Sequence, residues 1–306
     1  MDITSYGGWE RCARLSNGRI ELIAPLEIGP RVIRLGWLNQ LNLFQEIETD
    51  LGKKGGEEWR LYGGHRLWHA PEEKPRTYFP DNQPVEASGE EMILVLTQEV
   101  EKTTGIQKRI ILEMSEKVNR VKVTHQLWNR NPWSVEFAPW ALSVMRKGGV
   151  AIVPQEPFVS HQQKLSPARP LVLWSYTDMS DPRWRWGKRL VTLRQDTSIS
   201  LPTKAGFGNT LGWVGYWVEG FLLLKLFSYY PDKTYPDFGS SVEIFTNQDF
   251  LEAETLAPLS RVSPGAMVQH VEDWFLFDQV NLPGEEEAME KTLTPLVEEA
   301  IQEVYS

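Results

Sequence analysis

Two glutamates near the C-terminal end, Glu252 and Glu254, have the spacing that most directly suggests chemistry. They lie in residues 250–256, which have the composition and alternation of a β-strand. A strand points successive side chains to opposite faces, so both carboxylates share one face, about 7 Å apart. Because buried carboxylates need partners or protons, that face must be wet, salt-bridged or part of a polar cleft. A solvated strand face without catalysis is the plain alternative.

A second strand-like run, residues 266–276, follows a turn at Pro264-Gly265. Alternation places His270, Glu272 and Trp274 on one side of this run. We therefore expect a β framework that presents both runs, and the acid–base groups on them, to a ligand.

Residues 45–84 are the least regular part of the sequence and are rich in glycine and proline. Long irregular segments inside a domain are often functional. At the centre of this predicted loop lies the motif GGHRLWHAPE, residues 63–72. Its paired glycines let the backbone come close to a ligand, and polar side chains follow at once.

The histidines of this motif, His65 and His69, are four residues apart with Glu72 beyond them, which invites a metal interpretation. Two histidines four residues apart point to the same metal ion only on a helix, and this segment is expected to be a loop. The alternative is that both histidines are structural, with their hydrogen bonds made inside the protein. No GxSxG, phosphate-binding, dinucleotide or CxxC motif occurs. We therefore expect no metal and no cofactor, and acid–base chemistry from His and Glu with aromatic walls remains.

The composition narrows the class of protein. The 306 residues, of which 41% are hydrophobic, can bury a large core, and 13 tryptophans offer packing or sugar-stacking surfaces. A net charge of −9 argues against nucleic acid and anionic membrane as partners. With one cysteine, no apolar leader and no long aliphatic run, the chain is expected to be soluble and cytoplasmic.

The order of elements predicts an all-β fold. A hairpin is expected around Asn17-Gly18 and another around Glu219-Gly220, and residues 204–209 are expected to form a loop. Lys225 interrupts an apolar strand, so we expect it at a cleft or sheet rim. The chain is expected to form one domain, residues 1–306, of two large antiparallel sheets packed face to face with a C-terminal helix at 285–304. Further strands are predicted at 12–15, 19–24, 31–35, 92–97, 107–114, 120–128, 150–153, 191–201, 211–217 and 221–227, and residues 135–145 mix aromatic and small residues.

Several segments resemble an uncharacterised family within the galactose mutarotase-like superfamily. They are GGHRLWHAPE, FAPWALSVM at 137–145 and VEIFTNQDFLEAETLAPLSRVSPGAMVQHVEDW at 242–274, with NGRIEL and IGPRVIRLGW near the N-terminus. The resemblance covers most of the chain. It implies a β-supersandwich that binds a carbohydrate on the concave face of one sheet.

The same resemblance implies roles for individual residues. Aldose 1-epimerases use a histidine as general acid on the ring oxygen and a glutamate as general base on the anomeric hydroxyl, and ring opening needs both. Glu254, on a late strand before a Pro-Gly turn, matches the base best, although Glu252 shares its face. His65 matches a position in the active cleft. The segment expected to carry the epimerase acid, residues 138–142, contains no histidine.

Three hypotheses follow for the function. The first is an aldose 1-epimerase-like isomerase acting on a sugar or sugar derivative, with Glu254 as base and His65 or Lys225 as acid. The second is a non-catalytic carbohydrate-binding domain with Trp68, Trp140 and Trp213 as platforms, and the third is a scaffold protein. The expected substrate contacts are Arg31, Arg66, Trp68, Trp140, Lys204, Lys225, Glu243 and Glu252.

Overall fold

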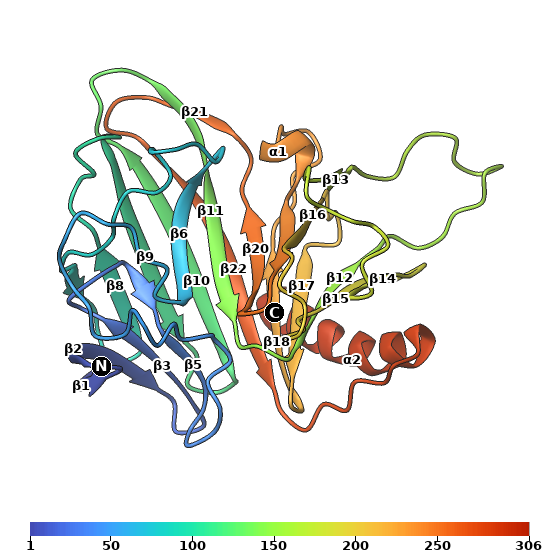
Figure 1. Ribbon diagram of the computed structural model, residues 1–306, viewed down its shortest axis with the longest axis horizontal. Helices are drawn as coiled ribbons and strands as arrows, with labels where there is room; N and C mark the ends of the chain where they lie inside the picture. The colour runs from blue at the N-terminus through green and yellow to red at the C-terminus, as the bar shows by residue number, and fades with distance from the viewer. Residues whose placement is uncertain (306) are drawn as a thin grey trace.

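A computed structural model describes residues 1–305, and it consists mainly of two large antiparallel sheets packed face to face (Figure 1). A smaller four-stranded sheet at the N-terminus and a C-terminal helix complete the architecture. The prediction of an all-β fold with large antiparallel sheets and a C-terminal helix is confirmed.

The ten-stranded sheet is antiparallel throughout its paired strands and follows the order β14-β15-β12-β17-β18-β22-β10-β9-β8-β7. The predicted hairpin at Glu219-Gly220 joins β17 to β18. The bounds are β7 Glu86–Ser88, β8 Ile93–Thr97, β9 Ile106–Met114, β10 Arg120–Asn129, β12 Val150–Pro154, β14 Trp184–Trp186, β15 Leu190–Arg194, β17 Trp213–Val218, β18 Phe221–Phe227 and β22 Met267–Phe277.

The eight-stranded sheet follows the order β13-β16-β19-β20-β11-β6-β4, and β21 pairs with β11 beside this path. The bounds are β4 Arg31–Val32, β6 Gly64–Ala70, β11 Val135–Met145, β13 Leu171–Leu173, β16 Thr203–Phe207, β19 Val242–Thr246, β20 Leu251–Leu256 and β21 Ser260–Val262. A short turn, α1 Pro236–Gly239, precedes β19.

The N-terminal sheet has the order β1-β2-β3-β5. Its predicted hairpin at Asn17-Gly18 is confirmed, and Gly18 adopts the left-handed φ of +83° that this turn requires. The single strand predicted at residues 31–35 is instead divided between the eight-stranded and N-terminal sheets. The remaining bounds are β1 Asp2–Tyr6, β2 Trp9–Ser16, β3 Ile20–Pro25 and β5 Arg34–Trp37.

Two segments predicted to be loops are central strands, which corrects the sequence interpretation. The motif at residues 63–72 forms β6, between β4 and β11, and residues 204–207 belong to β16, between β13 and β19. Glycines misled the prediction in both segments. At Gly64 the chain passes so close to β4 that a Cβ atom would lie 2.2 Å from the Val32 carbonyl oxygen.

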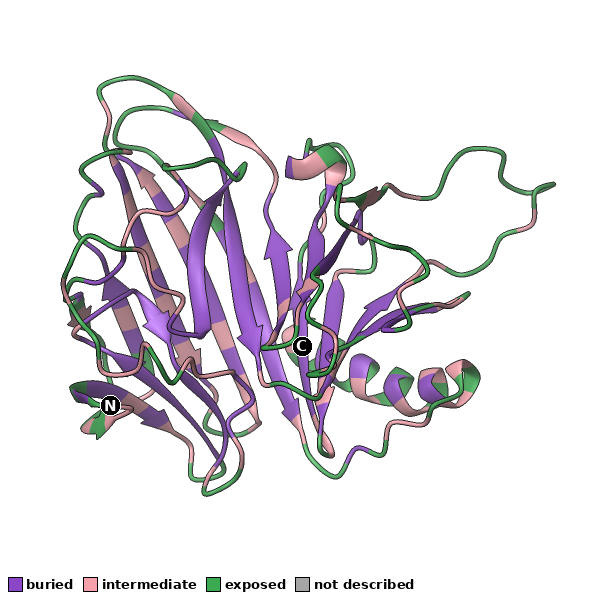
Figure 2. Cartoon of the chain, in the orientation of Figure 1, coloured by how far each residue is buried: buried purple, intermediate pink, exposed green. Residues whose placement is uncertain are grey.

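Most of the core lies between the two large sheets, where the inward faces of their strands are buried (Figure 2). Alternation decides which side chains enter it. In β20, Leu251 and Ala253 point into this core, while Glu252 and Glu254 take the opposite face of the eight-stranded sheet. We call that opposite face, directed away from the ten-stranded sheet, the outer face.

The C-terminal helix α2, Glu286–Tyr305, covers the other side of the ten-stranded sheet (Figure 1). Its buried residues recur at helical spacing and pack on β17, β18 and β22, together with Trp213. Pro295 lies inside the helix as the sequence indicated. Within residues 1–305, no helix has the length and apolar character needed to cross a membrane.

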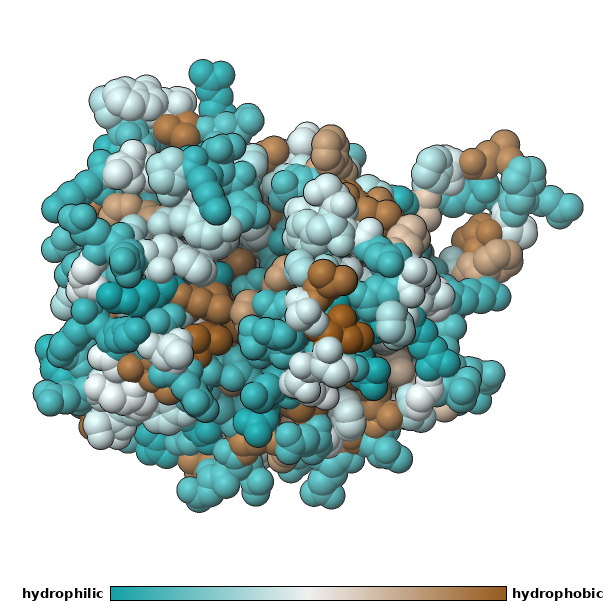
Figure 3. Space-filling model, in the orientation of Figure 1, coloured by the Kyte–Doolittle hydropathy of each residue, from teal (hydrophilic) through white to brown (hydrophobic). Residues whose placement is uncertain are grey.

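An irregular arm, residues 155–170, projects from the body between β12 and β13 (Figure 1). It carries exposed apolar side chains, among them Phe158 and Leu165 (Figure 3). His161 lies on this arm and is exposed.

Candidate functional site

The outer face of the eight-stranded sheet gathers charged side chains from four strands. Strand register places them in two adjacent rows across the sheet. One row runs through Arg66, Leu142, Glu254 and Glu243, and the other runs through Val144, Glu252, Phe245 and Lys204. The cluster formed by Arg66, Lys204, Glu243, Glu252 and Glu254 is called the carboxylate cluster below.

Ion pairs connect the carboxylate cluster. Lys204 Nζ lies 2.7 Å from Glu243 Oε2 and 3.1 Å from Glu254 Oε2, so one ammonium group serves two carboxylates. Arg66 Nη2 lies 3.4 Å from Glu252 Oε1. Of the three states that the sequence allowed for the Glu252 and Glu254 face, the structure has the salt-bridged one.

Tryptophan side chains support and enclose the cluster. Trp140 donates its indole N–H to Glu254 Oε2 at 2.8 Å, and its ring lies 5.0 Å below the Lys204 ammonium. Trp68 packs edge-on against Trp140, and the Arg66 guanidinium lies 4.3 Å from the centre of the Trp68 ring. Such cation–π contacts hold the cationic groups in place where burial removes water.

Three loops, one on each side of β6 and one after β13, add an aromatic rim that the sequence did not assign to the site. Trp59 and Tyr78, from residues 45–84, pack against Trp68, and Trp59 also faces Arg66 at 5.1 Å. On the other side, the Trp174 ring lies 4.8 Å from Lys204 Nζ. Their only signal in the sequence was an excess of tryptophan.

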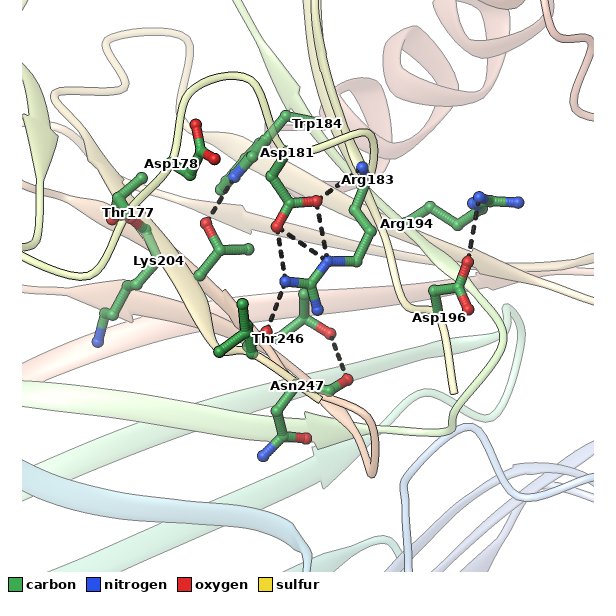
Figure 4. Close-up of polar contacts among 12 residues, drawn as sticks. Thr177, Asp178, Asp181, Arg183, Trp184, Arg194, Asp196, Lys204, Thr246 and Asn247 are labelled. Carbon is green, nitrogen blue, oxygen red and sulfur yellow. Dashed lines mark hydrogen bonds and ion pairs between the residues drawn. The ribbon is translucent and has the colours of Figure 1, made fainter. Parts of the chain in front are cut away.

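The segment that carries Trp174 is anchored to the site strands by polar contacts (Figure 4). Thr177 donates its hydroxyl to the carbonyl oxygen of Lys204 and accepts the Trp174 amide. Farther along, Arg183 forms an ion pair with Asp181 at 2.7 Å and donates to the Leu201 carbonyl. These bonds fix the position of Trp174 over Lys204.

Several buried polar atoms of the cluster have no hydrogen-bond partner within residues 1–305. They are Nε and Nη1 of Arg66, Oε1 of Glu243 and Oε1 of Glu254. An unpartnered buried donor or acceptor costs about 1–3 kcal/mol, more when charged. Donors and acceptors left open side by side within an aromatic rim are what a polyhydroxylated ligand would satisfy.

The cluster also binds protons more tightly than isolated glutamates would. Burial, followed by repulsion from Glu254, raises the pKa of Glu252 to about 7. Burial raises the pKa of Glu243 well above its ordinary value, and burial raises that of Glu254 against the opposing pull of Lys204. Three carboxyl groups therefore compete for two cations, and the cluster can exchange protons near neutral pH.

The predicted pair of Glu254 and His65 is not formed. His65 follows the alternation of β6 and points to the inner face, where Nδ1 lies 2.8 Å from Ser143 Oγ and Nε2 lies 2.7 Å from His125 Nε2. It is completely buried between the sheets. The expectation that His65 lies in the cleft assumed a loop at residues 63–72. Because β6 is a strand, alternation points the His65 side chain away from the outer face and into the space between the sheets.

Lys225 was expected at a cleft or rim, and this expectation is wrong. Its ammonium is buried between the sheets, 3.1 Å from Glu272 Oε1 and 3.2 Å from the Ala253 carbonyl oxygen. His270, Glu272 and Trp274 do share one side of β22, as predicted, but that side faces the same interior. Neither Lys225 nor His65 can act on a ligand at the outer face.

Two other predicted contacts have structural roles. Arg31 neighbours Arg66 across β4 and β6, and its guanidinium is bonded to Asp81 at 2.7 Å and to the Leu61 and Gly63 carbonyls. Trp213 is covered by α2 on the far sheet and is not a platform. The structure thus brings together Arg66, Trp68, Trp140, Lys204, Glu243, Glu252 and Glu254.

Among the residues described, the group of three potential metal ligands whose donor atoms lie close together is in the interior. His65, His125 and Glu272 have donor atoms within 4.8 Å of one another. The Glu272 carboxylate already accepts hydrogen bonds from Thr255 and Trp274 and is neutralised by Lys225. Its charge and lone pairs are thus used within the protein. His69 instead lies 3.6 Å from Glu101, so the triad His65, His69 and Glu72 is not assembled.

No protein-family model and no curated protein matches this sequence. Solved structures do match. A galactose mutarotase-like protein from Lactobacillus casei has a TM-score of 0.57 at 12% identity, over 87% of this chain and 100% of its own. A galactose mutarotase related enzyme from Lactobacillus acidophilus has a TM-score of 0.54 at 8% identity, over 88% and 98%. A galactose mutarotase-like protein from Clostridium acetobutylicum has a TM-score of 0.53 at 10% identity, over 90% and 98%. Identities this low show a common fold and no more.

Proposed function

We propose that this chain, which has the galactose mutarotase-like fold, binds a sugar ring at the outer face of the eight-stranded sheet and opens and recloses it. This is chemistry of the aldose 1-epimerase type, with Glu254 as the general base. The observation that carries the proposal is the geometry of Glu254. One of its oxygens is held by two donors, and the other is buried without a partner beside further open polar atoms.

The fixed oxygen makes Glu254 an oriented base. Trp140 and Lys204 both donate to Oε2, which stabilises the ionised carboxylate and restricts its rotation. Oε1 remains to accept the proton of an anomeric hydroxyl. The raised pKa of Glu254 moves its basicity toward neutral pH, where a general base works best.

The surroundings suit a sugar. The rings of Trp59, Trp68 and Trp174 provide apolar surface for the C–H faces of a pyranose, while the open Nε and Nη1 of Arg66 can donate to its hydroxyls. Since Glu254 and Glu243 are fully buried, the aromatic rim must open for a sugar to enter. Residues 45–63, 71–84 and 174–183, which lie outside the strands, carry that rim and are the segments expected to move.

Interconversion of anomers tests the proposal. One anomer of each of a panel of aldoses is dissolved with the protein, and its conversion is followed by NMR. Wild-type protein is expected to accelerate conversion of at least one sugar. Glu254→Gln should lose about 10²–10⁴-fold in kcat because an amide cannot take the proton. Glu113→Gln, on a strand of the other sheet, is the matched control. A rate equal to that in buffer for every sugar would contradict catalysis.

Non-catalytic sugar binding is the second candidate, because no histidine in residues 1–305 is placed among the cluster's contacts. The two functions separate in calorimetry. Binding of a mono- or oligosaccharide that Trp68→Ala weakens, without any acceleration of anomer exchange, would favour this alternative. No binding to any sugar would contradict both.

A further inference from the structure

We infer that Glu252 donates the proton that the ring oxygen needs, in the role that a histidine has in aldose 1-epimerases. The inference rests on the proposed function and adds a second catalytic residue to it. Ring opening by a base alone would leave an alkoxide on the ring oxygen, so an acid must reach O5 while Glu254 reaches the hydroxyl on the same carbon, C1.

The histidines of the chain lie elsewhere. Between the sheets, the His65 ring contacts the His125 ring, the His125 ring contacts the His270 carbonyl oxygen, and the His270 ring contacts Thr255. His69 contacts Glu101 there. The fifth, His161, is exposed on the projecting arm. Because the outer face of the eight-stranded sheet receives none of these rings, its acid must come from another residue type.

Counting charges shows that a carboxyl group in the cluster can hold a proton. Arg66 and Lys204 supply two positive charges, and Glu243, Glu252 and Glu254 supply three acidic groups. All five side chains are buried or nearly buried, so water does little to screen the excess negative charge. A buried carboxylate without its own countercharge takes up a proton instead.

Geometry distinguishes Glu252 from the other two glutamates. Glu254 is held ionised by Trp140 and Lys204, and Glu243 has no exposed surface at all. The Glu252 side chain is 12% exposed, so it alone of the three is in contact with solvent. Its contact with Arg66, at 3.4 Å, is long for an ion pair and leaves room for a protonated carboxyl.

Its surroundings agree with this role. Burial and the charge of Glu254 raise the pKa of Glu252 to about 7, so the acid form is available at neutral pH. Glu252 and Glu254 are two residues apart on one strand face, with Cα atoms about 7 Å apart, so a sugar lying over both can present O5 to Glu252 and O1 to Glu254. The charged groups that act on Glu252 are Glu254, Arg66, Lys204 and Glu72.

The step is balanced in protons and electrons. Glu254 takes the proton of the anomeric hydroxyl, the C1–O1 bond gains its second pair, and the C1–O5 bond breaks toward O5. Glu252 gives its proton to O5, so the product is the open-chain aldehyde with a free hydroxyl. After rotation about C1–C2 the same transfers run backward, which returns each proton to its starting residue.

Kinetics give the first test. Glu252→Gln is expected to lower kcat at least 10²-fold while sugar binding by calorimetry changes less than threefold. Wild-type kcat/KM should fall as pH rises through about 7, as the acid is lost. Arg66→Met removes a charge that favours ionised Glu252, so this alkaline limb should move to higher pH. An unchanged rate for Glu252→Gln, or an alkaline limb that Arg66→Met leaves in place, would overturn the assignment.

A second readout does not require activity. In protein labelled with ¹³C at the glutamate carboxyl carbons, NMR should show one resonance that titrates near pH 7 and that is missing from Glu252→Gln. If no glutamate resonance titrates between pH 6 and 8, the inference fails even for an active enzyme. If that resonance is present but no sugar is converted, the proton on Glu252 stands and the proposed function fails.

Discussion

At the scale of the residue, Lys225 and Glu272 form an ion pair that is completely enclosed between the sheets. Three donors, from Lys225, Thr255 and Trp274, satisfy the two carboxylate oxygens. Such a pair adds little stability relative to apolar residues, but removing one member leaves an uncompensated buried charge. Both members of the pair belong to the ten-stranded sheet, and the facing sheet contributes the Thr255 hydroxyl to Glu272 and the Ala253 carbonyl oxygen to Lys225.

Replacing Lys225 with methionine should destabilise the fold by about 3–5 kcal/mol, because Glu272 then loses its countercharge. Urea unfolding followed by fluorescence measures this change. The double variant Lys225→Met with Glu272→Gln should recover part of the loss, since the amide needs no countercharge. A Lys225→Met protein as stable as wild type would refute the importance of the pair. Since Lys225 lies on the inner side, sugar binding should remain.

The alternation of side chains along a strand predicted correctly which residues share a face, wherever the strand itself had been predicted. It placed Glu252 with Glu254, and His270 with Glu272, as the structure has them. The same alternation, applied to residues 64–70, would have placed the His65 and Arg66 side chains on opposite faces of a strand. It was not applied because the glycines and prolines on either side favoured a loop.

At the scale of the element, β6 and β16 explain why the sequence revealed the glutamates but not the whole site. Both are short central strands, and their glycines allow close approach of neighbouring chains, at Gly64 to β4 and at Gly206 to Ser240. Local propensity disfavours glycine in strands, whereas the tertiary crowding that requires it is invisible in the sequence. The pairing of β6 with β11, two strands far apart in the sequence, could not be predicted from the sequence either.

The helix α2 is the element whose sequence pattern was clearest, and it provides a test of the far sheet. Leu293 is buried against β18 and β22, so Leu293→Ala should cost about 2–5 kcal/mol of the free energy of unfolding. Ile301, on the exposed side of the same helix, is the matched control, and Ile301→Ala should cost well under half as much. Both are measured by thermal or urea unfolding. Equal effects would show that α2 does not pack as described.

At the scale of the whole molecule, the eight-stranded sheet carries buried polar side chains on both faces, although its inner face is otherwise apolar. Its outer face carries the carboxylate cluster, and its inner face contributes His65 and Ser143 to a network with His125, His270 and Glu272. The paired-sheet architecture was predictable because many alternating strands and one helix leave few other solutions. The two polar sets were not separable in the sequence, since each combines buried glutamates with a buried lysine and only the face of the strand distinguishes them.

The two sets differ in how they respond to acid, and this gives opposite predictions for one measurement. Burial lowers the pKa of His270 from 6.5 to about 3, whereas burial raises the pKa of Glu252 from 4.5 to about 7. Between pH 6.5 and 5 the unfolded chain protonates His270 and the native state does not, so this residue makes the free energy of unfolding fall as pH falls. Glu252 is protonated in the native state and ionised in the unfolded chain over that range, so it opposes the fall.

Urea unfolding at pH 6.5 and pH 5 should therefore separate the two variants. His270→Gln should lose less stability on acidification than wild type, by about 1.4 kcal/mol per pH unit, because a proton-binding difference has been removed. Glu252→Gln should lose more than wild type, by a similar amount per unit, because the opposing group is gone. His161→Gln, on the exposed arm, serves as the control and should follow the wild-type curve. If Glu252→Gln instead lost less stability on acidification than wild type, the burial of the carboxylate cluster would be wrong. The outer face would then have to be open to water in solution, and the proton that the proposed reaction draws from Glu252 would not be held at neutral pH.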